Sequence, residues 1–249
     1  MRKRLFLATL TIAAAVALSA CGGSKSASKS GKILTIEEGP DVETIDPALN
    51  QSADGANYIT MISDNLLRLD KDGKIAPSLA EKYEVSDDGL TWTFHLRDGL
   101  KWSDGSKLTA NDFVYSWQRM VDPEVAAPYA ETMLGMVEGY KDAIGNPDAN
   151  GNTTTTPDRT KLKVEATDDK TFVVHMSRPT PYFDRLATFA ALSPVKKDVV
   201  EANPDGWSID PKTYISSGPF KLTEWQPGSY LMFEKNENYW DADSIKLDG

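Results

Sequence analysis

Residues 75–129 read IAPSLAEKYEVSDDGLTWTFHLRDGLKWSDGSKLTANDFVYSWQRMVDPEVAAPY, and the apolar periodicity changes along this stretch. Its first half holds two segments of alternating apolar and polar residues, 81–86 and 90–97, with Asp-Asp-Gly at 87–89 between them. An Asp-Gly turn between two alternating runs is a hairpin signal. The stretch therefore predicts two antiparallel strands and, after a turn at 102–105, a helix.

The second predicted strand has one apolar face and one polar face. Trp92, Phe94 and Leu96 recur every second residue and therefore share a face. His95 falls on the opposite, polar face. A solvated or hydrogen-bonded strand histidine accounts for this position better than a catalytic one.

The helix after the turn begins at Thr109, which we expect to cap it. Asp112 stands three residues later, where a carboxylate complements the positive end of the helix dipole. Phe113 and Trp117, with Met120 or Val121, form an apolar stripe at helical spacing, which is typical of core packing.

Similar patterns extend over the rest of the chain. They predict strands at 32–38, 161–166, 171–176, 214–225 and 230–235, and helices at 56–69, between 129 and 144, from 181, and near 194. Hairpins that alternate with helices indicate a mixed α/β (α+β) fold.

The composition excludes several classes of protein. The chain has 249 residues, with 27 Lys and Arg against 37 Asp and Glu, so its formal net charge is −10. An acidic protein is unsuited to non-specific nucleic-acid binding, because phosphates attract basic surfaces. A single Cys and two His leave no intramolecular disulfide and no thiolate-rich metal site.

The N-terminus predicts export. Three basic residues at 2–4 precede an apolar run at 5–20, which would rise only about 24 Å as a helix and so falls short of a bilayer core. We therefore interpret 1–20 as a signal peptide. Leu18-Ser19-Ala20-Cys21 resembles the bacterial lipobox, in which cleavage leaves a lipidated Cys. The alternative is an ordinary secretory signal with a chance Cys.

The residues that follow predict a tether. Residues 21–32 are rich in Gly, Ser and Lys, and no large apolar side chain occurs between Cys21 and Gly31. Removal of residues 1–20 takes away three positive charges, so the remainder carries −13. We expect an acidic body, held at the cell surface or in the periplasm by the lipid on Cys21.

Motifs for chemistry are missing from the sequence. It contains no G-x-S-x-G, no Gly-rich phosphate loop and no H-E-x-x-H. Asn146-x-Asp148-x-Asn150-Gly151 begins like a calcium loop, but the twelfth position is Pro157 instead of Glu. We therefore predict no catalytic residue, no metal ligand and no cofactor, although a carboxylate pair for glycoside hydrolysis stays open. The residues alone indicate an exported lipoprotein that binds something.

The ordered motifs resemble those of extracellular solute-binding proteins of the oligopeptide-binding type (family 5), which serve ABC importers. The pieces that carry the resemblance are Pro77-Ser78-Leu79-Ala80-Glu81, Trp92-Thr93-Phe94-His95-Leu96-Arg97, Lys101-Trp102-Ser103-Asp104-Gly105, Asp112-Phe113-Val114-Tyr115-Ser116-Trp117-Gln118-Arg119, Asp122-Pro123, Ala127-Pro128-Tyr129, Pro179-x-Pro181-Tyr182-Phe183, Ser193-Pro194-Val195, Gly218-Pro219-Phe220 and Asn238-Tyr239-Trp240.

The resemblance implies a periplasmic-binding-protein-like fold, in which two lobes close on an extended peptide without covalent chemistry. It assigns 33–63 and 195–249 to a split first lobe, here incomplete, and 64–194 to an inserted hairpin-rich subdomain. The implied partners are an oligopeptide and the permease and ATPase subunits of the importer. Neither nucleic acid nor a cofactor is implied.

The resemblance also implies binding residues. Gln51, Ser52 and Ala53 would offer main-chain contacts to the peptide, Tyr129 corresponds to a pocket tyrosine, and Phe189 falls on the expected pocket wall. Gln51 departs from the acidic residue of the family pattern. The alternatives are a turn for Ser52 and Ala53, helix packing for Tyr129 and core for Phe189.

The family pattern also has a second lobe, which 249 residues do not provide. We expect an N-terminal fragment of a peptide-binding lipoprotein, in which residues 22–249 alone bind peptides weakly or not at all. The alternatives are a binder of dipeptides, nickel chelates or sugars on the same scaffold, or, less favoured, a secreted hydrolase.

Overall fold

The structure is a computed structural model that describes residues 31–37 and 39–249. The predicted signal peptide, Cys21 and nearly all of the predicted tether lie outside the described residues. Residues 32–249 form one compact unit.

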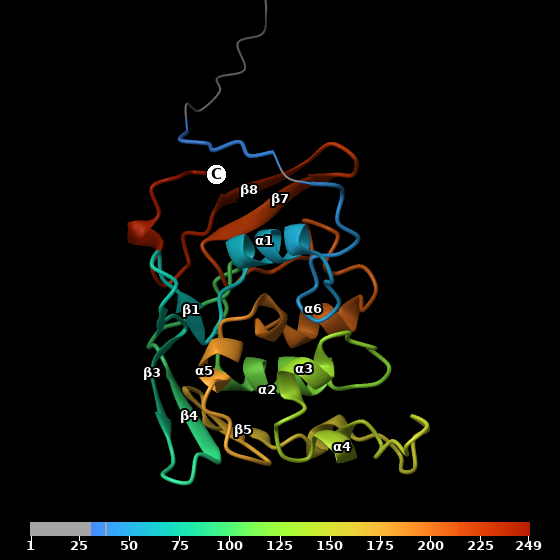
Figure 1. Cartoon of the computed structure of the whole chain (residues 1–249). Coiled ribbons are helices and arrows are strands. Elements are labelled where there is room, and N and C mark those ends of the chain that lie inside the picture. The colour runs from blue at the N-terminus through green and yellow to red at the C-terminus, as the bar shows by residue number, and fades with distance from the viewer. Residues whose placement is uncertain (1–30, 38) are drawn as a thin grey trace, which may run out of the picture. The chain divides into compact units, whose positions relative to one another are not determined.

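Short helices and antiparallel strands alternate along this unit (Figure 1). The α-helices are α1 (Ala53–Ile62), α2 (Ala110–Met120), α3 (Ala130–Leu134), α4 (Tyr140–Ala143), α5 (Phe183–Leu186) and α6 (Lys197–Ala202), and the 3₁₀ helices are η1 (Arg159–Lys161), η2 (Ala190–Leu192) and η3 (Ala242–Ser244). The strands are β1 (Leu67–Leu69), β2 (Ile75–Pro77), β3 (Ala80–Val85), β4 (Thr91–Leu96), β5 (Val164–Asp168), β6 (Thr171–His175), β7 (Phe220–Gln226) and β8 (Tyr230–Lys235). The prediction of a mixed α/β fold is confirmed.

The largest sheet among the described residues has the strand order β3-β4-β6-β5, all antiparallel. Both predicted hairpins, β3–β4 and β5–β6, are confirmed and pair side by side, with Phe94 opposite Phe172. Trp92, Phe94 and Leu96 are buried as the alternation predicts, whereas His95 is half-buried and lies 3.4 Å from a Glu84 carboxylate oxygen.

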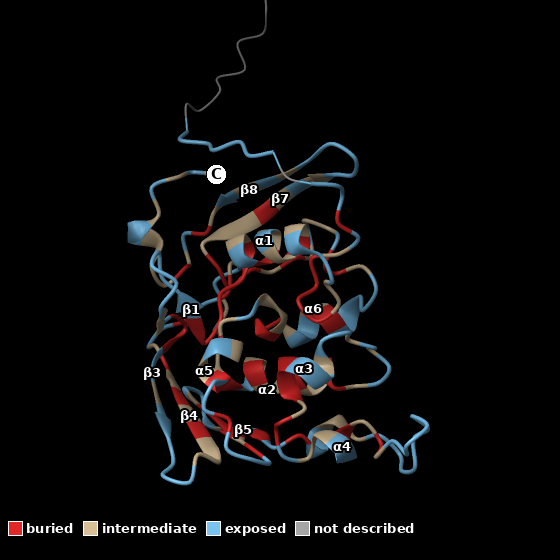
Figure 2. Cartoon of the chain, viewed as in Figure 1, coloured by how far each residue is buried: buried red, intermediate tan, exposed pale blue. Residues whose placement is uncertain are grey.

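Helix α2 packs its aromatic stripe against this sheet. The Trp117 ring meets Phe172 edge to face at 4.9 Å between centroids, and Phe113 lies 5.6 Å from the same ring. The predicted cap is present, because the Thr109 N–H donates to the Asp112 carboxylate at 2.7 Å. Figure 2 shows the buried residues concentrated on α2 and β4.

At the other end of the unit, α1 packs beneath the β7–β8 hairpin (Figure 1). Tyr58 of α1 stacks on Phe233 of β8 at 6.0 Å. The apolar side chains of the unit form two clusters, of which the larger draws on residues between Leu66 and Leu192 together with Ala48. The smaller contains Val42, Ile45, Ile59, Ile62, Val195, Val200, Trp207, Tyr214 and Leu222. The division into 33–63 with 195–249 and 64–194 stays a prediction.

The predicted helix at 56–69 is wrong in extent. Helix α1 begins three residues earlier, at Ala53, because Ser52 caps it, and ends at Ile62. The Ile62 carbonyl accepts from the Gly218 N–H at 2.9 Å, and the chain continues as β1, which pairs with β2. Apolar spacing alone does not distinguish a long helix from a helix followed by a strand.

The predicted strand at 32–38 is wrong for the described residues 32–37, which form no strand. The segment makes two main-chain hydrogen bonds, from Leu34 N–H to the Gly249 carbonyl and from Asp248 N–H to the Lys32 carbonyl. Ile33 and Leu34 are exposed. A regular strand needs a longer ladder than these bonds supply.

Other boundaries also differ from the predictions. The helical region at 129–144 is two short helices, α3 and α4, separated at Gly139, which has φ of +77° and lies against the Lys161 carbonyl. The helix predicted near 194 begins at Lys197, and β7 begins at Phe220 instead of 214. Within the described part of the chain, no helix is long and apolar enough to span a bilayer.

Candidate functional site

Gln51, Ser52 and Ala53 lie where the chain enters α1, and all three are exposed. Ser52 is extended, with φ of −104° and ψ of 150°. Its hydroxyl oxygen accepts from the Gly55 N–H at 2.9 Å and so caps the helix. The hydroxyl of Ser52 is therefore committed to capping the helix, and its carbonyl accepts from the Ala56 N–H at 3.1 Å as the first bond of α1.

The Asn50 side chain bonds to both main-chain groups of Ser52. Its Nδ2 donates to the Ser52 carbonyl at 2.9 Å, and its Oδ1 accepts from the Ser52 N–H at 3.3 Å. The Asn50 N–H itself donates to the Asp46 carbonyl at 3.0 Å. The segment is thus fixed through Asn50 to the turn that begins at Asp46.

That turn is anchored by a buried ion pair. Arg119 of α2 binds Asp46 with both nitrogens of its guanidinium fork, at 2.6 Å to Oδ2 and 3.1 Å to Oδ1. The Ala48 N–H adds a bond to Oδ1 at 2.9 Å. Asp46 and Arg119 are only 1% and 5% exposed, so this fork is rigid and fully desolvated. Helix α2 therefore sets the position of Gln51, Ser52 and Ala53.

Tyr214 closes the turn from the other side. Its hydroxyl donates to the Ile45 carbonyl at 3.3 Å and lies 3.4 Å from the Ser63 hydroxyl. Burial raises the pKa of the Tyr214 phenol, and the Asp46 carboxylate raises it further. Tyr214 therefore stays a neutral donor at physiological pH.

Phe189 lies at the start of η2, which packs against α1. The Asn65 Nδ2 donates to the Phe189 carbonyl at 2.8 Å, which fixes this main chain beside the end of α1. The Phe189 ring is 49% exposed, so it is not a core residue. Phe189 is thus tied to the segment that follows α1, whereas 51–53 lie at the start of that helix.

Tyr129 precedes α3 and is 39% exposed. Its carbonyl accepts from the Met133 N–H at 2.9 Å, so its main chain starts the helix. Among the described residues, no hydrogen bond or ring contact joins Tyr129 to Phe189 or to 51–53. The structure does not bring Tyr129 into direct contact with the other candidates.

Asp64 is a buried acceptor that the sequence analysis did not single out. Its carboxylate accepts from the Tyr239 hydroxyl at 2.8 Å, the Trp240 indole at 3.1 Å and the Ser78 hydroxyl at 2.5 Å. Burial raises the pKa of Tyr239, and the Asp64 charge raises it further. Asp64 ties the Asn238-Tyr239-Trp240 motif to the segment between α1 and β1.

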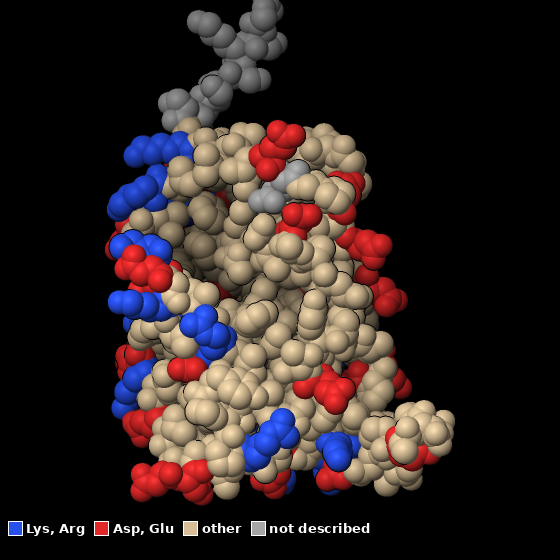
Figure 3. Space-filling model, viewed as in Figure 1, with Lys and Arg blue, Asp and Glu red and all other residues tan. Residues whose placement is uncertain are grey.

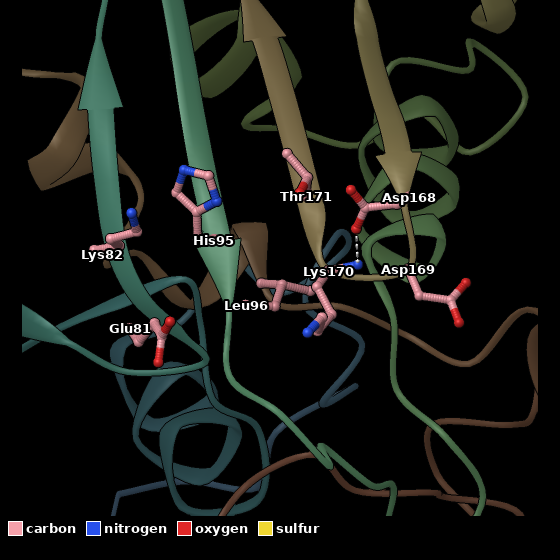
Figure 4. Close-up of a pocket in the computed structure, with 8 residues that line it drawn as sticks. All are labelled: Glu81, Lys82, His95, Leu96, Asp168, Asp169, Lys170 and Thr171. Atoms are coloured by element: carbon pink, nitrogen blue, oxygen red, sulfur yellow. Dashed lines mark hydrogen bonds between the residues drawn. The ribbon is translucent and has the colours of Figure 1, made fainter.

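A surface hollow of about 740 Å³ lies elsewhere, at one end of the four-stranded sheet (Figure 4). It is lined from β3, β4 and the β5–β6 turn by Glu81, Lys82, His95, Leu96, Asp168, Asp169, Lys170 and Thr171. None of the candidate binding residues lines it. Its Lys170 pairs with Asp98 at 2.6 Å, and the Asp168 carboxylate accepts from the Lys170 N–H at 2.8 Å, so turn chemistry accounts for these charges.

Charge is unevenly distributed over the face seen in Figure 3. Lys and Arg side chains gather along one edge, over β1 and β3, and the middle of the face carries few charged atoms. The face is hollowed beside that edge, to the left of α1 in this view (Figures 1 and 3).

The described residues contain no group of three or more His, Cys, Asp or Glu that could hold a metal ion. In the loop that begins like a calcium site, Asp148 Oδ1 accepts from the Asn150 N–H at 2.8 Å and the Asn152 N–H at 2.9 Å. These bonds identify Asp148 as a turn residue.

Sequence reasoning missed Asp46, Arg119 and Asn50 as the supports of the site. Asp46-Pro47 signals only a turn, and no pattern links Asp46 to an arginine 73 residues away. Asn50 precedes a capping Ser, which is a weak signal for local side-chain bonding to the backbone.

The sequence and the fold of this chain are similar to those of known proteins. The periplasmic oligopeptide-binding protein OppA of Salmonella typhimurium is 36% identical over 95% of this chain, which spans 41% of that protein. The dipeptide-binding protein DppE of Bacillus subtilis is 34% identical over 99% of the chain and 45% of its own length. The crystal structure of Haemophilus influenzae OppA in complex with RPPGFSPFR matches with a TM-score of 0.76 and 36% identity, over 84% of this chain and 39% of that one.

The fold is therefore that of the periplasmic-binding-protein-like OppA structures, of which this chain corresponds to one lobe. Residues 74–249 match the family described as "Bacterial extracellular solute-binding proteins, family 5 Middle". The matched segment is more than half of the chain, and the likeness extends through its fold. This protein belongs to the family 5 bacterial extracellular solute-binding proteins.

Proposed function

We propose that this protein is the solute-binding component of an ABC importer and that it captures extended oligopeptides without covalent chemistry. The observation that carries the proposal is the likeness to an OppA solved with a peptide bound, at 36% identity and a TM-score of 0.76. The chain spans 41% of the length of its Salmonella relative, so the activity is proposed for the whole protein.

The described site supports main-chain recognition. Ser52 has an extended backbone in the exposed segment 51–53, and its own carbonyl accepts from the Ala56 N–H at 3.1 Å as the first bond of α1. A peptide that pairs with the main chain of 51–53 would gain hydrogen bonds that do not depend on the peptide's side chains. Phe189 and Tyr129, both partly exposed, would supply apolar contact to those side chains.

The proposal includes the partners and the location. The permease and ATPase subunits of the importer would receive the loaded protein, and a lipid on Cys21 would hold it at the cell surface or in the periplasm. Incorporation of labelled palmitate into the wild-type protein, with none in Cys21→Ser, supports the anchor. Equal labelling of both proteins would contradict it.

A thermal-shift panel on the purified, native-length protein tests the ligand class. A ligand that binds only the native state raises the midpoint of unfolding. We expect extended peptides of several lengths to raise it, and maltose, a nickel–histidine chelate and free amino acids to leave it unchanged. Shifts with the sugar or the nickel chelate, and none with peptides, would refute the proposal.

Dipeptides are the second candidate ligand class. The relative named as the dipeptide-binding protein DppE is 34% identical over 99% of this chain, close to the value for the oligopeptide-binding relative. Dipeptides in the same panel distinguish the two classes. A larger shift with dipeptides than with peptides of four or more residues would favour this candidate.

A further inference from the structure

The loop between α4 and η1 contains the only Asn-Gly pair of the chain, Asn150-Gly151. A main-chain nitrogen can attack the side-chain carboxamide of the asparagine before it and close a succinimide ring. The attack is easiest when the residue that supplies the nitrogen is glycine, because glycine has no Cβ to obstruct the approach. A Cβ built at Gly151 would meet no atom within 4 Å, so the surrounding structure adds no obstruction.

The carboxamide of Asn150 is free to react. Asn150 is exposed, and its side chain makes no hydrogen bond within the described residues. The two other asparagines of the loop differ, because Asn146 Nδ2 donates to an aspartate carboxylate at 2.6 Å and Asn152 Nδ2 donates to Asp148 Oδ2 at 3.2 Å. Asn146 is also followed by Pro147, whose nitrogen carries no hydrogen.

A hydrogen-bonded turn holds the attacking nitrogen. The Gly151 N–H donates to the Asp148 carbonyl at 3.0 Å. The Asp148 carboxylate adds two bonds to the same turn, with Oδ1 accepting from the Asn150 N–H at 2.8 Å and from the Asn152 N–H at 2.9 Å. These bonds, that of the Asn152 N–H first, hold the pKa of Asp148 below its ordinary value of 3.8, so the carboxylate is ionised at pH 7. The nitrogen is released for attack when the turn opens.

We propose that Asn150 is a site of spontaneous deamidation and that the Asp148 carboxylate limits the rate by holding the turn closed. The Gly151 nitrogen gives its proton to hydroxide and bonds to the Asn150 Cγ. The Cγ–Nδ2 bond breaks and releases ammonia, which takes its third hydrogen from water. Water then opens the ring. Addition at Cγ breaks the bond to the Gly151 nitrogen and leaves aspartate, whereas addition at the main-chain carbonyl carbon of residue 150 leaves isoaspartate.

The modification changes the charge of the loop. Either product places a second carboxylate in the turn that Asp148 closes, and like charges repel. The modified turn should therefore open more readily than the original one. Figure 1 shows the loop after α4 standing out from the body and away from α1, so the change does not touch residues 51–53. The inference is independent of the proposed function.

The test follows the mass of residues 142–159 while the purified native-length protein is incubated at neutral pH. Trypsin releases these residues as one peptide that contains all three asparagines of the loop. We expect the peptide to gain the mass difference between an amide and a carboxylate at Asn150, and fragmentation to show Asn146 and Asn152 unchanged. No gain at Asn150, or equal gains at the three asparagines, would overturn the assignment of the site.

Asp148→Ala tests the role of the turn. Loss of the bonds to the carboxylate should speed the deamidation of Asn150 about threefold to tenfold, which is the effect of about one net hydrogen bond on opening. The matched control is Asp70→Ala in the β1–β2 turn, because Asp70 Oδ1 likewise accepts from the N–H groups of Asp72 and Lys74, both at 2.9 Å. The control should leave the rate at Asn150 unchanged.

The same measurement in urea separates the turn from the chemistry. With the turn open in both proteins, wild type and Asp148→Ala should deamidate at one shared rate, which is faster than that of the folded wild type. Equal rates in the two folded proteins, or a difference that persists in urea, would overturn the role of Asp148.

Discussion

At the scale of single residues, the Asp46 carboxylate accepts from both nitrogens of the Arg119 fork and from the Ala48 N–H, and nearly all of it is shielded from water. Breaking one side of a buried ion pair leaves the other charge buried without compensation, which costs about 3–5 kcal/mol. We expect Asp46→Asn to lower the free energy of unfolding by about that amount, as measured by urea denaturation at pH 7.

The control for this change is Asp72→Asn, because Asp72 pairs with Lys71 at 2.9 Å with both side chains exposed. Exposed pairs contribute little, so the control should unfold like the wild type. Equal losses in the two variants would show that the Asp46–Arg119 fork does not anchor the turn.

The exposed ring of Phe189 is expected to contact the ligand instead of stabilising the fold. Phe189→Ala should weaken peptide binding about fivefold, because a half-exposed aromatic ring offers about 1 kcal/mol of apolar burial to a ligand. Tyr182→Ala is the matched control, as Tyr182 is 53% exposed and was not a candidate for binding. Calorimetry compares them, and a Phe189→Ala affinity equal to that of wild type would remove Phe189 from the site.

At the scale of secondary-structure elements, the turn before α2 docks on two segments, one just before α6 and one between α6 and β7. Ser103 N–H donates to the Ser216 carbonyl at 2.8 Å, and Lys196 Nζ lies 2.5 Å from Asp104 Oδ2. Burial alone would raise the pKa of Asp104, but the hydrogen bonds from Lys196 and Ser106 outweigh it and hold that pKa below its ordinary value of 3.8. Burial likewise opposes the rise in the pKa of Lys196, which its bond to Asp104 brings above 10.5.

These pKa shifts determine the pH range over which the Asp104–Lys196 pair stabilises the fold. A carboxyl whose folded pKa is lowered stabilises the fold above its unfolded pKa, and that contribution is lost as the pH falls below 3.8. Asp104→Asn should therefore lower the free energy of unfolding by about 1 kcal/mol at pH 7, and by less at pH 3. Urea denaturation at the two pH values measures the difference, and a deficit that is the same at both would contradict the charge-based account.

Local signals predicted those elements whose partners are close in sequence. The Asp87-Asp88-Gly89 hairpin and the Thr109 cap with Asp112 depend on neighbours within a few residues, and both are present. The predicted helix at 56–69 and the strand at 32–38 failed because distant residues decide them. Gly218 takes the Ile62 carbonyl at the end of α1, and Gly249 is the acceptor for Leu34.

The same distinction holds for the candidate site. The family resemblance suggested Gln51, Ser52, Ala53, Tyr129 and Phe189 as candidates, and the structure shows 51–53 at the start of α1 and Phe189 bonded to Asn65 beyond its end. The residues that position these candidates could not be predicted from the sequence. The bond of Asn65 to Phe189, for example, spans 124 residues. Tertiary packing brings such pairs together, and no local pattern encodes it.

At the scale of the whole molecule, the fold and the family are established. The central claim is the proposal that the ligand is an extended peptide. The described unit offers an exposed segment with extended backbone at Ser52, a rigid anchor at Asp46 and a half-exposed Phe189. These features are compatible with the proposed contact to a peptide main chain.

Isothermal titration of the native-length protein with RPPGFSPFR and shorter extended peptides, followed by mass spectrometry of the recovered peptide, tests this claim most directly. The account predicts saturable binding at one site and recovery of the peptide intact. Absence of binding heat across the whole peptide series, or recovery of cleaved peptide, would contradict it.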